Sequence, residues 1–113
     1  MTYWVLDEHG EPKPCDDVLA WGAWFEATKD TGERVVARDR DEGAAPGGVN
    51  VSTVFLGLDH QFGDGPPVLW ETLVFGGVLD GEMRRYTSRA AALAGHQEMC
   101  TRVAATVVKN ARE

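Results

Sequence analysis

The sequence is poor in cysteine and histidine, and it contains no long apolar run. Only two of its 113 residues are cysteine and three are histidine. Cys15 and Cys100 lie far apart and outside any CxxC pattern, so we expect a reduced pair rather than a disulfide framework. No apolar stretch approaches the ~20 residues of a membrane-spanning helix. The start MTYWVLDEHG also lacks the basic and apolar segments of a secretory signal peptide. These absences favour a protein of the cytoplasm.

Basic residues are also scarce, since 11 lysines and arginines face 18 aspartates and glutamates, for a net charge of -7. An acidic surface repels phosphate groups, so we expect no direct binding to nucleic acid. The acids gather in residues 1–33, which contain eight of them and only two lysines. This surface meets a basic partner protein, mimics nucleic acid, or is an ordinary solvated surface, which is the commoner case.

The motifs of common enzymes are missing as well. The chain contains no nucleophile elbow, Walker loop, dinucleotide fingerprint, HExxH or catalytic-cysteine signature. Three scattered histidines and one candidate carboxylate, Glu71, make a small catalytic set. We therefore expect a non-enzymatic protein without a metal centre or a cofactor.

What the sequence does contain is a series of strand and helix patterns that fits a single domain over residues 1–113. The predicted strands cover 2–6, 11–15, 33–40, 49–58, 68–75 and 82–87, and the predicted helices cover 18–29 and about 88–109. Because no strand–helix–strand repeat occurs, a parallel sheet is disfavoured. The prediction is an α+β fold, in which an antiparallel sheet of four to five strands carries both helices on one face.

Both predicted helices have start signals, and the second has an apolar stripe. Asp16 or Asp17 can cap the first helix, and Thr87 or Ser88 the second. The stripe recurs every three or four residues, at Leu93, His96, Cys100, Val103 and Val107. His96 is either a hydrogen-bonded core histidine, which is the usual case, or part of a site. Gly95 beside it suggests close approach to another backbone, since glycine costs a helix about 1 kcal/mol relative to alanine.

The predicted strand VLWETLVF is apolar on both faces. Its two faces carry Val68, Trp70, Thr72 and Val74 on one side, and Leu69, Glu71, Leu73 and Phe75 on the other. An antiparallel sheet with one wet face should instead alternate apolar and polar residues. We expect another subunit, a folded-back loop or a ligand to cover the second face. The simplest form is a homodimer, or a higher homo-oligomer.

Glu71 lies in the middle of that second face and needs a partner. A carboxylate among apolar residues must be solvated, paired or protonated. Arg84 and Arg85 on the next strand are candidate partners, and Asn50 and Ser52 fall on the corresponding face of the preceding strand. These residues would form a polar floor with apolar walls, as in a small-molecule site. The alternative is an ion pair inside a dimer interface.

The link from Gly57 to Pro67 contains the polar residues Asp59, His60 and Asp64. They match only part of a calcium loop, because the twelve-residue pattern and its closing glutamate are absent. A zinc site would need more histidines or cysteines in spaced pairs. We interpret the link as an ordered turn without metal, with Asp59 and His60 as candidate walls of a site. The candidate ligand-binding residues are Ser52, Asp59, His60, Glu71, Arg84, Arg85 and His96.

The stretch VSTVFLGLDHQFGDGPPVLWETLVFGG, followed by RRYTS and AGH, resembles a family of small, mostly uncharacterised proteins encoded by tailed bacteriophages. The resemblance covers most of the chain from Trp21 onward. The matching positions are Gly57, Asp59, His60, Gly65, Pro66, Glu71, Thr72, Gly76 and Gly77. Relatives of this family carry a helix-capping acid before AGH, whereas this chain reads TSRAAALAGH.

The resemblance implies the cytoplasm of an infected bacterium as the setting. There we expect an accessory protein that counters host defence by binding or sequestering a small, nucleotide-like ligand at a sheet face or subunit interface. The alternative is an acidic inhibitor or adaptor that acts on a host protein.

Overall fold

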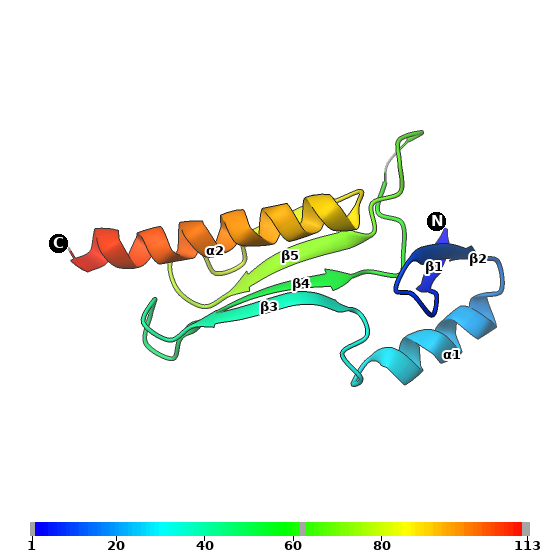
Figure 1. Cartoon of the computed structure of the whole chain (residues 1–113), viewed down its shortest axis with the longest axis horizontal. Coiled ribbons are helices and arrows are strands. Elements are labelled where there is room, and N and C mark those ends of the chain that lie inside the picture. Colours follow the sequence, from blue (N-terminus) through cyan, green and yellow to red (C-terminus); the bar gives the residue numbers. More distant parts are fainter. Residues whose placement is uncertain (1, 62, 112–113) are drawn as a thin grey trace.

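The computed structural model describes residues 2–61 and 63–111, with side chains described as far as residue 106. The elements run in the order drawn in Figure 1. They are β1 (Tyr3–Leu6), β2 (Pro12–Cys15), α1 (Val18–Thr28), β3 (Val35–Asp41), β4 (Val49–Phe55), β5 (Trp70–Phe75), β6 (Met83–Tyr86) and α2 (Arg89–Ala111). Every predicted element is present, with ends that differ from the prediction by no more than three residues.

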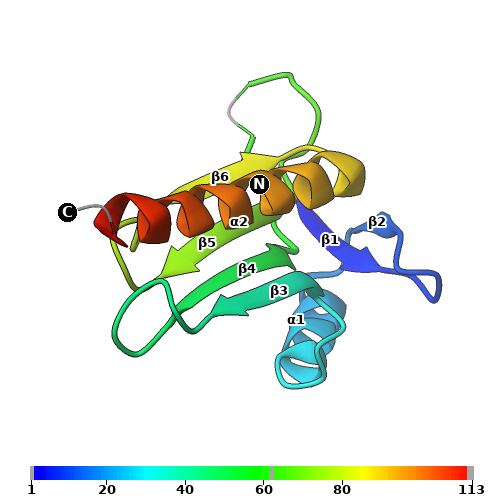
Figure 2. The same cartoon turned by 60° about the vertical axis from the view of Figure 1, so that its left-hand side comes forward.

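The four strands β3 to β6 form one antiparallel sheet in which each strand pairs with the next along the chain. α2 lies along one face of this sheet and contacts all four strands (Figure 1). β1 and β2 form a separate antiparallel hairpin, and α1 packs against that hairpin at one end of the sheet (Figure 2). The predicted α+β fold with an antiparallel sheet is confirmed. Only α2 packs on a face of this sheet, whereas α1, which was predicted on the same face, packs on the β1–β2 hairpin instead.

Trp21 on α1 explains why this helix stays with the hairpin. Its indole N–H lies 3.1 Å from the carbonyl oxygen of Trp4 in β1 and 3.0 Å from that of Gly57, which follows β4. The Trp4 amide also donates to the Gly57 carbonyl at 2.8 Å. Gly57 has φ +77, and a Cβ there would lie 3.3 Å from the ring of Phe25. A glycine at this position therefore lets three segments meet at one point.

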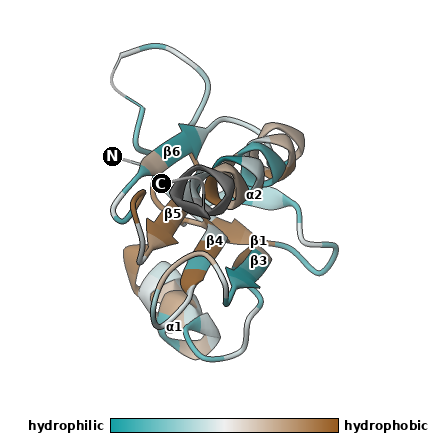
Figure 3. Cartoon of the chain, turned by 90° about the vertical axis from the view of Figure 1, so that its left-hand side faces the viewer, coloured by the Kyte–Doolittle hydropathy of each residue, from teal (hydrophilic) through white to brown (hydrophobic). Residues whose placement is uncertain are grey.

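The apolar core lies between α2 and the sheet in two clusters. One consists of Ala44, Val49, Val51, Val74, Met99 and Val103, and the other of Phe55, Leu69, Trp70 and Ala92. Side chains of the hairpin and α1 pack against the second cluster, among them Trp4 and Trp24. Figure 3 shows the same division by hydropathy, with hydrophobic central strands β4 and β5 between the more hydrophilic edge strands β3 and β6.

α2 begins as predicted, because the Ser88 hydroxyl accepts from the Ala91 amide at 3.0 Å. The predicted apolar stripe is partly wrong. His96 and Val103 are buried and Cys100 is half-buried, but Leu93 is 36 % exposed and Ala92 faces the sheet in its place. Val107 lies outside the described side chains. In this rotation the small residues of the helix face its neighbours: Ala92 packs near the start of β5, and Gly95 lies against Tyr86 of β6.

The molecule is elongated, with extents of 54 × 31 × 21 Å. Its Cα radius of gyration is 15.9 Å, whereas a compact chain of this length would have about 13 Å. Neither described helix is long and apolar enough to cross a membrane.

Candidate functional site

The predicted site residues fall in three separate places. Ser52, Glu71 and Arg85 share the face of the sheet that points away from α2. Arg84 and His96 lie on the α2 side, and Asp59 and His60 belong to the link between β4 and β5. The structure therefore does not bring all seven residues together into one site.

Glu71 is paired with Arg85, which is one of its two predicted partners. The Arg85 Nε donates to Glu71 Oε2 at 3.0 Å, and the two residues are direct neighbours in the β5–β6 register. The Glu71 side chain is 16 % exposed. Arg84 cannot take this role, because it stands opposite Thr72, whose side chain is buried under α2. The predicted division of β5, with Trp70 and Thr72 beneath the helix and Glu71 on the far face, is confirmed.

The far face of the sheet, which we call the open face, carries a mixture of apolar and polar side chains. Strand alternation and the register place on it Arg38, Asn50, Ser52, Val54, Glu71, Leu73, Phe75, Met83 and Arg85. Phe75 is 49 % exposed and Met83 is 45 % exposed. Leu69 was predicted on this face, but it precedes β5, which begins at Trp70, and it is buried in the second core cluster. No element of the described chain covers Phe75.

A basic hollow adjoins the open face at its β3 edge. It has a volume of about 170 Å³, and its lining includes Lys29, Arg34, Arg38 and Val54 but no acidic residue of the described chain. Val54 also neighbours Glu71 in the β4–β5 register, so the hollow and the Glu71–Arg85 pair flank the same residue. Lys29 contacts Glu26. In the described part of the chain, neither Arg34 nor Arg38 has a carboxylate within ion-pair distance.

Arg34 is held in place by neutral groups. Its Nε donates to Thr28 Oγ1 at 3.0 Å, and its guanidinium carbon lies 3.7 Å from the centre of the Phe25 ring. Burial lowers the pKa of Arg34 from its ordinary value, yet an arginine stays charged at physiological pH. The result is a preformed, partly desolvated cation beside an accessible hollow.

On the α2 side, His96 is the centre of a buried polar network. The imidazole is fully buried, and its Nδ1 lies 2.7 Å from Thr53 Oγ1, which in turn lies 2.5 Å from Thr72 Oγ1. Its Nε2 lies 2.7 Å from Asp39 Oδ2 on β3. An ionised carboxylate only accepts, so Nε2 donates to Asp39, while Nδ1 pairs with the Thr53 hydroxyl, which can either donate or accept. His96 is thus a satisfied core histidine toward the threonines, and only its Asp39 side opens outward.

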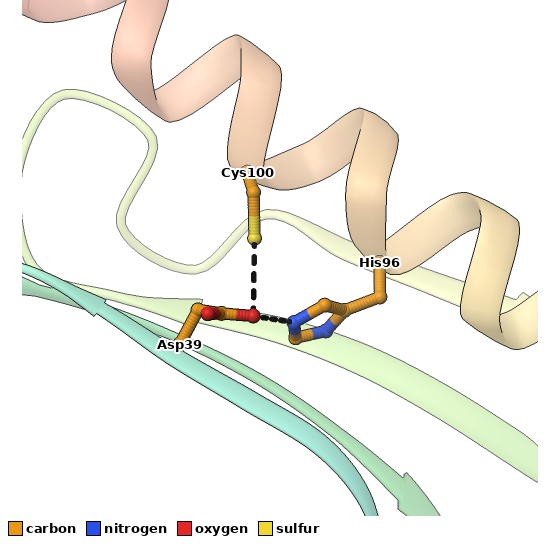
Figure 4. A group of neighbouring side chains, drawn as sticks. All are labelled: Asp39, His96 and Cys100. Carbon is orange, nitrogen blue, oxygen red and sulfur yellow. Dashed lines mark hydrogen bonds and ion pairs between the residues drawn. The ribbon is translucent and has the colours of Figure 1, made fainter.

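Cys100 joins Asp39 and His96 at that opening (Figure 4). Its Sγ lies 3.8 Å from Asp39 Oδ2, and the ligand-type atoms of the three residues all lie within 4.8 Å of one another. Burial, followed by the charge of Asp39 and its hydrogen bond, raises the pKa of the Cys100 thiol. A groove of about 300 Å³ passes this point and is lined by Asp39, Asp41, Glu42 and Cys100 among others.

The sequence reasoning did not find this cluster. The signal that could have pointed to it is the spacing of His96 and Cys100, four residues apart and therefore on one helix face. Asp39 was placed within a predicted strand, but no local pattern says which β3 residue faces α2 at His96.

Asp59 and His60 lie where the two ends of the link come together. Asp59 Oδ1 accepts from the amides of Gln61 at 2.8 Å and Val68 at 2.9 Å, and the His60 amide donates to the Val68 carbonyl at 3.0 Å. Asp59 thus ties the two ends of the link together. Its observed role is that of a loop-closing residue.

No protein-family model, no curated protein and no solved structure matches this chain.

Proposed function

We propose that the protein is a small non-enzymatic binding protein that captures an anionic, nucleotide-like ligand on the open face of its sheet. The observation that carries this proposal is the basic hollow, in which Arg34 and Arg38 have no carboxylate partner among the described residues of a chain with net charge -7. Arginine forks suit phosphate oxygens, and a partly desolvated cation attracts an anion more strongly than one in water.

The rest of the open face supplies the other contacts that such a ligand needs. Ser52 lies next to Arg38 in the register, and Asn50 lies two residues away on the same strand. Leu73, which pairs with Ser52 in the register, offers apolar area against which a base can pack. Polar groups on an apolar floor are the usual composition of a small-molecule site.

The setting and the quaternary structure are part of the same proposal. The resemblance to tailed-bacteriophage proteins supports a role in the cytoplasm of the infected host, where sequestering a nucleotide signal would blunt a defence response. Phe75 and Met83, both almost half exposed, support a homodimer formed through the end of the open face that lies away from the hollow.

The test is a binding screen with calorimetry. Cyclic and linear mono- and dinucleotides, the corresponding nucleosides and inorganic phosphate would be titrated into the wild type and into Arg38→Gln. We expect a phosphorylated nucleotide to bind, the nucleoside to bind poorly, and R38Q to lose about tenfold or more in affinity, because hydrogen bonds to charged groups contribute about 1.5–3 kcal/mol. Raised salt should weaken binding.

Arg84→Gln is the matched control, because Arg84 neighbours Arg85 in sequence but points to the α2 side of the sheet. It removes the same charge and should leave nucleotide affinity unchanged. The proposal fails if no phosphorylated compound binds at millimolar concentration, or if R84Q weakens binding as much as R38Q.

A different surface supports the second function class, an inhibitor or adaptor of a host protein. At the start of α1, Leu19 is 83 % exposed and Val18 is 50 % exposed, next to the exposed acids Asp16 and Asp17. Exposed apolar residues beside acidic ones form a surface that suits a basic partner protein. A host protein captured from bacterial lysate by the wild type but not by Leu19→Lys would favour this class.

A further inference from the structure

The geometry points to a binding site for a divalent transition-metal ion, Zn²⁺ being the best match, formed by Asp39, His96 and Cys100. This site lies under α2 and is separate from the open face, so it stands or falls independently of the proposed nucleotide binding. The site also departs from the prediction of no metal centre. That prediction rested on the Asp59–Asp64 link and on the spacing of cysteines and histidines along the sequence, neither of which matches a metal-binding pattern.

The three donor types are those that zinc takes in proteins. Thiolate sulfur, imidazole nitrogen and carboxylate oxygen bind Zn²⁺ at about 2.3, 2.0 and 2.0–2.2 Å, usually in a tetrahedron. The ligand atoms of such a tetrahedron are separated by about 3.3–3.6 Å. Here His96 Nε2 lies 2.7 Å and Cys100 Sγ lies 3.8 Å from Asp39 Oδ2. All three atoms fit within 4.8 Å of one another.

The adjustment that metal binding requires falls on the residue most able to make it. His96 is fixed, since its ring is fully buried. The Asp39 side chain is 61 % exposed, so its carboxylate can retreat by less than 1 Å from the imidazole to admit the ion. Three protein ligands then leave a fourth position facing the groove, for water or for a further ligand.

The other ring nitrogen of His96, Nδ1, already has the hydrogen-bond partner that a metal-binding histidine needs. When Nε2 binds the ion, Nδ1 must carry the proton, and Thr53 Oγ1 lies 2.7 Å away as its acceptor. Thr53 then donates to Thr72, 2.5 Å further along. Because a hydroxyl both donates and accepts, the pair of threonines can serve either tautomer of the ring. Such partners orient metal-binding histidines in general.

The groove also has the charge that a cation needs. Its lining contains Asp39, Asp41 and Glu42. Arg40, the one cation among its described lining residues, is bound to Glu42 and to the carbonyl of Gly47. Carboxylates concentrated in a groove raise the local concentration of cations. As the ion binds, the Cys100 thiol releases its proton to solvent and a metal–sulfur bond forms.

The test is a metal titration of chelator-treated protein. Zn²⁺ is titrated first, and Co²⁺ is titrated separately as a spectroscopic probe. We expect one equivalent to bind, the melting temperature to rise with Zn²⁺, and the Co²⁺ form to show a thiolate-to-metal charge-transfer band. Cys100→Ser should abolish that band and weaken binding by at least about tenfold, since even residues that only orient a ligand contribute 10–100-fold. Because substitution of the buried His96 can unfold the chain, Asp39→Asn, at an exposed side chain, is the second ligand variant.

Cys15→Ser is the matched control, because it removes the other free cysteine, far from α2. It should retain both the band and the affinity, and so should Arg38→Gln, which tests the open face instead. The inference is overturned if no equivalent of Zn²⁺ or Co²⁺ binds, or if binding persists unchanged in both C100S and D39N. Nucleotide binding by chelator-treated protein would then still support the proposed function.

Discussion

Asp59 accepts two backbone hydrogen bonds, from Gln61 and from Val68, and a weaker contact from the Thr2 hydroxyl at 3.4 Å. Partial burial alone would raise the pKa of this carboxyl. The hydrogen bonds from Val68 and Gln61 and the smaller contributions of Thr2 and His60 outweigh burial, and they lower the pKa below its ordinary value of 3.8. The ionised Asp59 side chain therefore holds the two ends of the link between β4 and β5 together.

At this residue we predict a pH-dependent stabilisation. A lowered folded-state pKa means that the ionised form stabilises the fold above the ordinary pKa, and that this contribution is lost as pH falls through the folded-state value. Near neutral pH, Asp59→Asn should lower the free energy of unfolding by at most about 1–2 kcal/mol. Solvent around the side chain screens its interactions and makes the loss smaller. The gap should narrow below about pH 4. Thermal unfolding across pH measures it, with Asp64→Asn, an exposed acid in the same link, as control. A gap that is constant down to pH 2 would contradict the assignment.

Among the elements, α2 depends on one glycine. A Cβ on Gly95 would lie 2.0 Å from the Tyr86 hydroxyl oxygen and 2.2 Å from Cζ of the same ring. The helix was predicted to approach a backbone at this point, and it approaches an aromatic side chain of β6 instead. The Tyr86 hydroxyl is itself buried and has no hydrogen-bond partner among the described residues. Gly95 therefore fixes how closely α2 packs on β6.

We predict that Gly95→Ala destabilises the protein even though alanine is the better helix former. The preference for alanine is worth about 1 kcal/mol, but overpacking typically costs about 1–3 kcal/mol, so the cost of the clash should exceed the gain. Chemical denaturation measures the difference. Gly22→Ala on α1 is the matched control, because a Cβ there meets nothing within 4 Å. It should be neutral or stabilising by up to about 1 kcal/mol. Equal stabilisation by both substitutions would show that α2 can move away from Tyr86.

At the scale of the whole molecule, the sheet has one covered and one open face. α2 covers the first, while the hairpin and α1 lie at the end and leave Phe75 and Met83 partly exposed (Figure 2). This arrangement accounts for an elongated shape with more surface than a compact chain of this length. A second copy is the proposed cover for the exposed end of the face.

For the assembled molecule we predict a dimer, of about twice the 12.3 kDa chain mass, at micromolar concentration. Phe75→Glu places a charge in the proposed interface and should convert the dimer to a monomer, since an unpaired buried charge is strongly unfavourable. Light scattering coupled to size-exclusion chromatography measures this. Leu19→Glu is the control, as it adds the same charge at an exposed apolar residue on α1. A monomeric wild type, or a dimer that survives F75E, would refute the prediction.

The sequence by itself determined the elements and narrowed the partner of Glu71 to two arginines, because both follow from local rules. Alternation of side chains assigned Glu71 and Thr72 to opposite faces of β5, and a short connection to the neighbouring antiparallel strand restricted the partner of Glu71 to Arg84 or Arg85. Glycine and aspartate at the turns and Ser88 at the helix start fixed most boundaries to within a few residues.

Only the tertiary structure decided what depends on how separate elements pack. Hydrophobic periodicity put α2 on the sheet but misplaced its rotation at Leu93, since the contact of Gly95 with Tyr86 sets that angle. The same rotation brings His96 and Cys100 against Asp39, which is 57 positions away from His96 in the chain. The position of α1 likewise sets Lys29 beside Arg34 and Arg38. Packing of side chains between distant segments carries no local periodic signal, so these two clusters emerge only in the folded chain.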